Sequence, residues 1–520
     1  MIRTIIKREF LDNILSFKFI ACVLVAIILT SVSTVFLRSD YLARLEDYRT
    51  GVTLNERNLK EVPVYSYLAP KVFKEPNPLS IFVSGIERET GTYADINHRD
   101  IPASLRGGLI KNEFSHMFSF FDMSSVITII FTLLAILLSY NAITGEKEEG
   151  MLSLSLANAV PRYKILLGKY FGILISLAVP LALLFLMGIL IVLLSRDIEV
   201  SASFFFSMTL LFGLSLLYLS SVAFIGLFVS ARTKKSFTSL LVLLSVYLIT
   251  VFLLPLAVNG YAGRVTSLRT RNFEANLPSV TDAREKAIEQ SLDKIRSPRT
   301  WLLPFPSRRG TMLLKRISPP EFLDYFKKTV RIQEKLMEDY AVKIESLREI
   351  DDAAAAAVRR WRNIILAMMP STDFTRMADL TAETGEDNLL LFVSKLKTYW
   401  HSYVHYLDEK NAFGLKYFYP YPEEFTPQEK DLIERINKDY VEGKQLAGYR
   451  GKYLEEALGV NPEVQNLDLS GLPAFVFHGS NITDKIGVML PNILVLISYN
   501  LVFLLLAHFS FNRYDPRKDA

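Results

Sequence analysis

Cysteine is almost missing from this sequence of 520 residues. Cys22 is the only one, and it lies inside an apolar run. A single thiol can build neither a disulfide framework nor a cysteine zinc site, so the sequence excludes both within one chain. We expect Cys22 to be a small apolar side chain packed in a helix.

The glycine-rich loop that cradles nucleotide phosphates is also missing. Gly-Lys pairs occur at Gly168-Lys169, Gly443-Lys444 and Gly451-Lys452, but none has the following Ser or Thr and the upstream glycine that such a loop requires. The chain therefore cannot hydrolyse ATP by that mechanism. No Ser-His-Asp order and no paired-carboxylate motif is recognisable either, so we predict that the chain is not an enzyme and has no cofactor of its own.

Metal-ligand spacings are scarce, because only two of the six histidines are suitably spaced. His401 and His405 lie four residues apart on an expected helix, where both imidazoles could reach one metal, with Asp408 and Glu409 nearby. Two histidines alone are a weak signal for a metal. We favour an aromatic packing face instead; its members are Tyr399, Trp400, Tyr403 and Tyr406. We predict no metal site.

Ionisable residues are nearly absent from the long apolar runs, and Asp122 lies near the end of one. A proton or ion relay inside a membrane needs buried ionisable groups. We therefore do not expect a proton-coupled secondary transporter. The net charge of +5 is small for a chain of this size and does not indicate a nucleic-acid partner.

Long apolar runs are what the sequence has in abundance. Half of its residues are hydrophobic while 22% are charged, so strongly apolar and strongly polar blocks must alternate. Six runs are long enough to span a lipid bilayer, and each must be helical because lipid offers no partner to an open backbone. The predicted spans are 19–37, 118–141, 167–195, 203–230, 237–258 and 485–511.

The first of these runs could be mistaken for a signal peptide. It has about 19 residues, enough to cross a bilayer and more than a usual signal core. No small-x-small cleavage pattern follows it. We therefore expect it to remain as an anchor.

Three prolines lie within or beside the spans: Pro180, Pro255 and Pro491. Each frees a backbone carbonyl and can kink a helix. They are either gating hinges or prolines of the kind that membrane helices ordinarily tolerate.

Lysine and arginine cluster in alternate connections between the spans. The basic segments are 1–18, 142–166, 231–236 and 512–520. The positive-inside rule places all four, and hence both termini, in the cytoplasm, in a multi-pass protein of the inner (plasma) membrane. Two large polar insertions, 38–117 and 259–484, are then extracytoplasmic.

The two insertions differ in pattern. Residues 38–117 mix Pro, Gly and Tyr without a long helical period, and 71–78 favour short strands and loops. The second insertion predicts a helix from Pro319 to about Ala367, a break at Pro370-Ser371 and another helix over 387–408. We expect the two helices to dock as an antiparallel hairpin.

Residues 1–18 form the last element of the predicted fold. Their apolar residues recur near helical spacing, as an amphipathic elbow helix in the membrane interface requires. The predicted fold class is therefore an all-α membrane protein. It has six transmembrane helices, the elbow helix, and a large, mainly helical extracytoplasmic domain.

The segment 142–166, between the second and third spans, begins with a run of charges. A short amphipathic helix along the membrane surface could present Glu146, Glu148 and Glu149 to a cytosolic partner. Leucines would hold it to the bundle: Leu152, Leu154 and Leu156. A push on this element would then move two spans. An ordinary charged loop that obeys the orientation rule explains the same residues.

The same stretch resembles the signature of ABC-2 type permeases, especially those with a large external insertion between their last two spans. The matching residues are Ile143, Gly145, Glu146, Lys147, Glu149, Gly150, Leu152, Pro161, Arg162, Leu167, Gly168 and Lys169. Asn141 stands where the family usually has Asp, and Met151 where it usually has Thr. The elbow residues 5–12, the turn 231–236 and the closing residues 511–517 are also similar to family segments. In the second insertion, 370–374 followed by a helix is the best parallel.

The resemblance implies the permease subunit of an ATP-driven exporter that moves an unidentified substrate outward. ATP and Mg would be bound by a separate nucleotide-binding ATPase subunit, and a second permease chain would complete a homodimer or heterodimer. The residues expected to couple to the ATPase are Gly145, Glu146, Lys147, Glu148, Glu149, Gly150, Arg232, Lys234 and Lys235. The alternative is an ATP-driven mechanotransducer that acts on an envelope partner and transports nothing itself.

Overall fold

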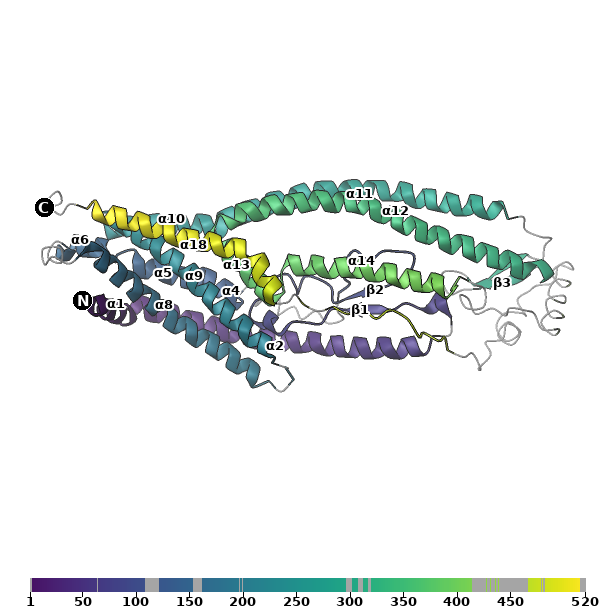
Figure 1. The fold of residues 1–520 in the computed structure, drawn as a ribbon, viewed down its shortest axis with the longest axis horizontal. Coiled ribbons are helices and arrows are strands. Elements are labelled where there is room, and N and C mark those ends of the chain that lie inside the picture. Colours follow the sequence, from purple (N-terminus) through teal and green to yellow (C-terminus); the bar gives the residue numbers. More distant parts are fainter. Residues whose placement is uncertain are drawn as a thin grey trace.

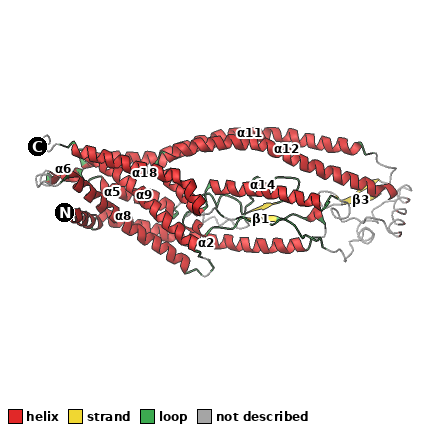
Figure 2. Cartoon of the chain, viewed as in Figure 1, coloured by secondary structure: helices red, strands yellow, loops and turns green. Residues whose placement is uncertain are grey.

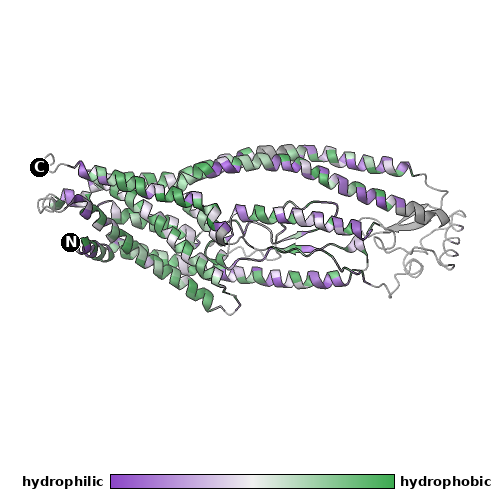
Figure 3. Ribbon diagram, in the orientation of Figure 1, coloured by the Kyte–Doolittle hydropathy of each residue, from purple (hydrophilic) through white to green (hydrophobic). Residues whose placement is uncertain are grey.

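The computed structural model describes residues 2–62, 64–107, 121–152, 161–195, 197–198, 200–295, 302–306, 312–316, 319–413, 466–477, 479 and 482–514, with 427, 431, 435 and 438. Helices account for 79% of it. The molecule is elongated, with an apolar helical bundle at one end and a more polar domain at the other (Figures 1 and 3).

Six helical stretches are long and apolar enough to cross a membrane, which confirms the predicted number of spans. The elements that form them are α2 (Phe17–Lys60), α4 (Met123–Val126), η3 (Ile127–Phe131), α5 (Thr132–Ser139), α8 (Arg162–Leu193), α9 (Ala202–Arg232), α10 (Ser236–Tyr247), η4 (Leu248–Leu253), α11 (Leu254–Asp293) and α18 (Ile482–Asn512). The α4–η3–α5 elements together make the second stretch, and α10–η4–α11 make the fifth.

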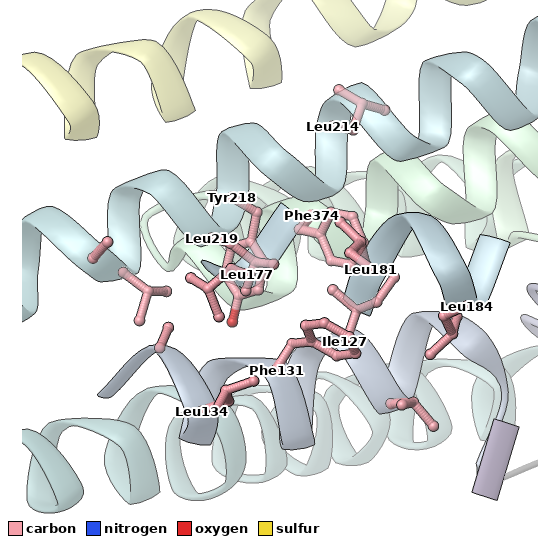
Figure 4. Close-up of a cluster of buried hydrophobic side chains, with 14 of the residues drawn as sticks. Ile127, Phe131, Leu134, Leu177, Leu181, Leu184, Leu214, Tyr218, Leu219 and Phe374 are labelled. Carbon is pink, nitrogen blue, oxygen red and sulfur yellow. The ribbon is translucent and has the colours of Figure 1, made fainter. Parts of the chain in front are cut away.

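The centre of the bundle is α9, which packs against α5, α8, α10 and α18. Figure 4 shows the side chains that meet there, among them Phe131, Leu177, Leu181 and Tyr218, all of them buried. In lipid such packing, rather than escape from water, holds helices together. The outer faces of α10 and α18 remain exposed and apolar, as a lipid-facing surface requires.

The three prolines of the spans behave differently. Pro180 and Pro491 lie inside α8 and α18 without ending either helix. Pro255 is the second residue of α11 and lies just after the π-helical turn η4. Because proline has no N–H to donate, a change of hydrogen-bond pattern just before Pro255 is physically expected.

The first apolar helix does not end where the span ends. α2 continues from Leu37 to Lys60, so the expectation that 38–117 contains no long helix is wrong for its first part. The physical reason is a second packing face: Tyr41 and Leu45 are buried beside the short helix η2 (Pro78–Ile81). Polar residues around that narrow apolar stripe hide the helical period in the sequence.

The distal domain, as we call everything beyond the bundle, contains two short antiparallel hairpins as well as helices (Figure 2). β1 (Lys71–Phe73) pairs with β2 (Tyr93–Asp95), and β3 (Leu302–Pro306) pairs with β4 (Met312–Arg316). The strand expected within 71–78 is thus present. The chain is mainly helical rather than strictly all-α.

The long helices of the distal domain lie close to the predicted bounds. α12 (Pro319–Ala367) and α14 (Glu386–Glu409) confirm both helical predictions in the second insertion. The two helices are antiparallel and joined by ion pairs, including Lys397 Nζ–Glu345 Oε1 at 2.5 Å and Arg362 Nη2–Glu386 Oε2 at 2.5 Å. α12 packs more extensively against α11, with which it forms the long hairpin of Figure 1.

The aromatic face of α14 packs onto residues 62–107. Trp400 Nε1 donates to the carbonyl of Asn97 at 2.7 Å, and Tyr403 Oη donates to the carbonyl of Leu68 at 3.1 Å. Both aromatic side chains are buried. This confirms the packing interpretation of the aromatic residues around His401 and His405.

A buried charge cluster joins the same segment to α12. Glu334 is fully buried, with Oε2 2.7 Å from His98 Nε2, while Arg99 donates to both of its oxygens at 2.9 and 3.0 Å. Burial alone would raise the pKa of Glu334, but the hydrogen bonds and positive charge of His98 and Arg99 outweigh it, and the pKa is lowered.

Between α12 and α14 the chain turns back into the bundle as α13 (Pro370–Ala382). α13 packs against α9 and α18, and its Phe374 ring stacks on Tyr218 of α9 with centroids 5.0 Å apart. α13 also brings a buried carboxyl group into the bundle: Asp373, which belongs to none of the six spans.

Candidate functional site

The base of the bundle, as we call α1 (Ile2–Ile14), α6 (Thr144–Glu148), the first turns of α8, residues 230–236 and the last turn of α18, gathers the predicted coupling residues (Figure 1). α1 lies along α8 at very short range. A Cβ on Gly168 would lie 2.7 Å from Ile5, and one on Gly172 would lie 2.5 Å from the Cβ of Glu9. Both positions therefore need glycine for the elbow helix to approach.

α6 is attached to α9 at its first residues. The hydroxyl of Ser230 accepts the backbone N–H groups of Ile143 and Thr144 at 3.0 and 3.1 Å. These are among the donors that the start of a helix leaves without an internal partner. The serine thus fixes where α6 begins.

Lys169 of α8 connects three elements. Its side chain is almost fully buried, and Nζ contacts Glu9 Oε1 of α1 at 2.5 Å and Glu146 Oε1 of α6 at 2.7 Å. A buried ammonium group is stable only when its charge is matched by close partners. The ammonium group of Lys169 therefore joins the elbow helix α1, the helix α6 and the third span α8.

Lys147 binds the end of α9. Its Nζ donates to the carbonyls of Ala231 at 2.5 Å and Thr233 at 3.0 Å, and it lies 5.0 Å from the centre of the Tyr514 ring. The last carbonyls of a helix lack internal donors and carry partial negative charge, so a lysine there is favourable.

Glu148 binds the start of α10 in the complementary way. Its two carboxylate oxygens accept the backbone N–H of Ser236 at 3.0 Å and the Ser236 hydroxyl at 2.5 Å. The amino end of a helix carries partial positive charge, which a carboxylate stabilises.

Arg162, at the start of α8, holds the end of α18. Its Nη1 donates to the carbonyls of Phe511, Asn512 and Tyr514 at 2.8, 3.0 and 2.8 Å. Lys147, Glu148 and Arg162 thus each reach a different helix end: that of α9, α10 and α18, respectively.

The model of the ABC-2 family transporter proteins matches residues 3–301, more than half of the 520-residue chain. The chain belongs to the ABC-2 transporter family. Proteins of this family are permeases, typically the non-catalytic membrane subunits of ABC transporters, and they generally pair with a nucleotide-binding ATPase subunit. The match covers α1 and the first five spans. No curated protein sequence matches the chain.

The permease presents its predicted coupling residues in two ways. Glu146 and Lys147 are half-buried in the contacts above. The exposed residues are Glu148, Glu149, Gly150, Arg232, Lys234 and Lys235. Gly150, with φ +73°, turns the chain where a side chain would be strained.

Leu152 is buried as expected, whereas Leu154 and Leu156 lie outside the described residues. Coupling to an ATPase through these positions stays a prediction.

Several residues of the permease base have contacts that the sequence did not assign. Ser230 and Ser236 carry no pattern that marks them, because their partners lie almost ninety positions away. Lys169 gave a usable signal: a lysine at the start of an apolar span has to find carboxylates when it is buried.

His401 and His405 of the permease lie on the exposed side of α14. His405 Nε2 contacts Glu409 Oε1 at 3.1 Å, and both side chains face solvent. Within the part of the chain that the structure describes, no three His, Cys, Asp or Glu side chains gather as a metal site would need.

Proposed function

We propose that this permease is the membrane subunit of an ATP-driven exporter of the inner (plasma) membrane, with its base in the cytoplasm. The positive-inside rule supports this orientation, because the exposed basic residues Arg232, Lys234 and Lys235 lie at the base, close to both ends of the chain. The distal domain is then extracytoplasmic. A separate ATPase subunit binds ATP and Mg.

The ATPase docks on the exposed surface of the base, which offers Glu149 together with Arg232, Lys234 and Lys235. Charged rims of this kind guide association and fix orientation between partners. The half-buried residues Glu146 and Lys147 lie behind that surface and pass its displacement on.

The observation that supports the proposal best is the set of contacts made by Glu146, Lys147 and Glu148. Three consecutive side chains bind α8, α9 and α10, and Lys169 adds α1. When the ATPase binds ATP and pushes α6, the four helices move as one unit. Two permease chains, identical or paralogous, form the pathway, and an unidentified substrate leaves outward.

Docking is tested by purifying a tagged permease from its native membrane. We expect an ATPase to co-purify, and the double variant Lys234→Glu/Lys235→Glu to lower its recovery at least about tenfold, the loss of about 1.4 kcal/mol of binding. The matched control is Arg331→Glu/Lys395→Glu, which reverses two exposed charges in the distal domain. Equal recovery with both variants, or no ATPase with the wild type, would refute the proposal.

Export is tested by comparing the small molecules and lipids outside cells that produce wild-type permease or a Lys169→Met variant. We expect at least one compound to decrease outside and accumulate inside in the variant. Identical profiles from two membrane-localised forms would contradict export.

A second function has one observation in its favour. α2 and the α10–η4–α11 stretch run without a break from the bundle into the distal domain. Motion of the bundle therefore also moves that domain, as a mechanotransducer acting on an envelope partner would need. Shortening α11 and α12 by the same number of turns separates the two functions. ATP-driven efflux that persists in reconstituted vesicles would leave the mechanotransducer without support.

A further inference from the structure

α13 reaches deep into the bundle, to the level at which three spans have their midpoints. Ser371 Oγ donates to the carbonyl of Thr250, and Tyr499 Oη donates to the carbonyl of Met368. Thr250, Tyr499 and the Tyr218 that stacks on Phe374 each lie more than ten residues from both ends of their spans. The first turn of α13 is therefore surrounded by membrane-embedded helices.

Asp373 lies in that first turn and is 1% exposed. Neither of its carboxylate oxygens has a hydrogen-bond partner among the described residues. The amide of Asn492 in α18 approaches it but stays outside hydrogen-bond geometry, and the Asn492 Nδ2 is itself without a partner. This differs from every charged side chain described at the base.

The groups that face Asp373 from its neighbours do not supply a matching cation. α18 offers Asn492 and the Tyr499 hydroxyl, and α9 offers the Tyr218 hydroxyl, which is shared with Thr132 at 2.6 Å. η4 consists of uncharged residues. α12 also packs against α13, and its Arg359 and Arg362 form ion pairs with Glu386 of α14. On α13 itself, Arg376 binds Asp387 at 3.4 Å and forms no ion pair with Asp373 within the described residues.

Two further acids lie where α13 packs against α4, farther along the helix from Asp373. Asp122 at the start of α4 is buried, and its carboxylate accepts from Ser84 and Ser125. Asp379 is the other acidic residue of α13. An ionised carboxylate deep in a bundle, without hydrogen bonds or a paired counter-ion, is strongly unfavourable. The neutral carboxylic acid is the form that this environment accepts.

We propose that Asp373 is a proton-binding site: it takes one proton from water when α13 inserts into the bundle and returns it when α13 withdraws. The carboxylate becomes a carboxylic acid on insertion, and no other reactant is needed. Acid conditions then favour the inserted state. Because one proton is linked to the movement, the ratio of withdrawn to inserted molecules rises by up to about tenfold per pH unit.

This site does not depend on the export proposal, since it requires neither ATPase nor substrate. A short segment inserted from the distal domain supplies a buried carboxyl group to the middle of the bundle.

The direct test is infrared spectroscopy of the full chain in lipid vesicles, titrated over pH. We expect a carbonyl band of a protonated carboxylic acid to persist at neutral pH, and to be lost in Asp373→Asn. The matched control is Asp387→Asn, a half-exposed acid eleven residues from Arg376, which should leave the band in place. A neutral-pH spectrum that is the same in wild type and Asp373→Asn would overturn the proposal.

A second test measures the movement. Cys22 is the only cysteine, so Cys22→Ala/Ser371→Cys carries one thiol at a buried position of α13. A membrane-impermeant maleimide is applied to this variant and to the same variant carrying Asp373→Asn. The labelling rate with Asp373 is divided by the labelling rate with Asp373→Asn, which cancels the pH dependence of the thiol. We expect this ratio to rise with pH. A ratio that stays constant over the titration would show that insertion is not linked to Asp373.

Discussion

The base of the bundle and the site of α13 treat buried charge in opposite ways. At the base, Lys169 has two carboxylates and Lys147 has three helix-end carbonyls within hydrogen-bond distance. At α13, Asp373 has neither a hydrogen bond nor a counter-ion among the described residues. A matched charge fixes neighbouring elements to each other. An unmatched one makes its element sensitive to protonation. The same chain thus contains a rigid joint and a titratable insert.

Breaking the ion-pair cluster of Lys169, Glu9 and Glu146 should give the largest loss of stability. Lys169→Met leaves Glu9 and Glu146 without their cation, and removing one partner of a buried pair costs about 3–5 kcal/mol. We expect a strongly lowered melting temperature in detergent. Lys7→Met, an exposed lysine on the same elbow helix, is the control and should change little. If adding Glu9→Gln and Glu146→Gln to Lys169→Met restored no stability, the explanation by unmatched charge would be wrong.

Glu334 extends the comparison to the distal domain. Its lowered pKa means that the cluster with His98 and Arg99 adds stability above the usual glutamate pKa. That stability is lost as pH falls through the lowered value. Glu334→Gln should cost about 1–3 kcal/mol near neutral pH because the bonds to charged partners weaken. It should also weaken the dependence of the free energy of unfolding on pH in the acid range. The same pH dependence in the variant and the wild type would contradict this explanation.

The close approach of α1 and α8 can be probed without changing any charge. Gly172→Ala places a methyl group against Glu9 and should destabilise by about 1–3 kcal/mol through overpacking. Gly213→Ala in α9 is the control, because nothing lies within 4 Å of an added Cβ there. Equal melting temperatures for the two variants would show that the elbow helix is not seated by these glycines.

No loss of stability is expected at the unmatched site. Asp373→Asn removes the need to take up a proton on folding, so the variant should be at least as stable as the wild type near neutral pH, and the difference should shrink as the pH falls. Thermal unfolding beside Lys169→Met measures the contrast. A loss as large as that of Lys169→Met would mean that Asp373 is charged and paired in the folded protein.

The sequence predicted the spans and the long helices well, because their signals are local. An apolar run reports burial in lipid, and prolines near 319 and 370 mark helix starts. α2 beyond Leu37 was missed since only a narrow stripe containing Tyr41 and Leu45 is apolar there. α13 was missed as part of the bundle because Asp373 and Arg376 make it look like an ordinary soluble helix.

The candidate site shows the same limit. The charged segment at the start of 142–166 was located from its residues, but the contacts that it makes could not be predicted. Lys147 and Ala231 are 84 positions apart, and no periodicity relates a lysine to a backbone carbonyl in another helix. Such pairings depend on how helices dock, which local patterns do not encode.

The unbroken α2 has a mechanical consequence. With 44 residues it is about 66 Å long at 1.5 Å per residue. A tilt of about 5° around its lower end would displace the upper end by about 6 Å, roughly one helix turn at the 5.4 Å pitch. A rearrangement in the bundle too small to alter its packing would therefore be magnified, through leverage, into a sideways stroke at the far end of the molecule.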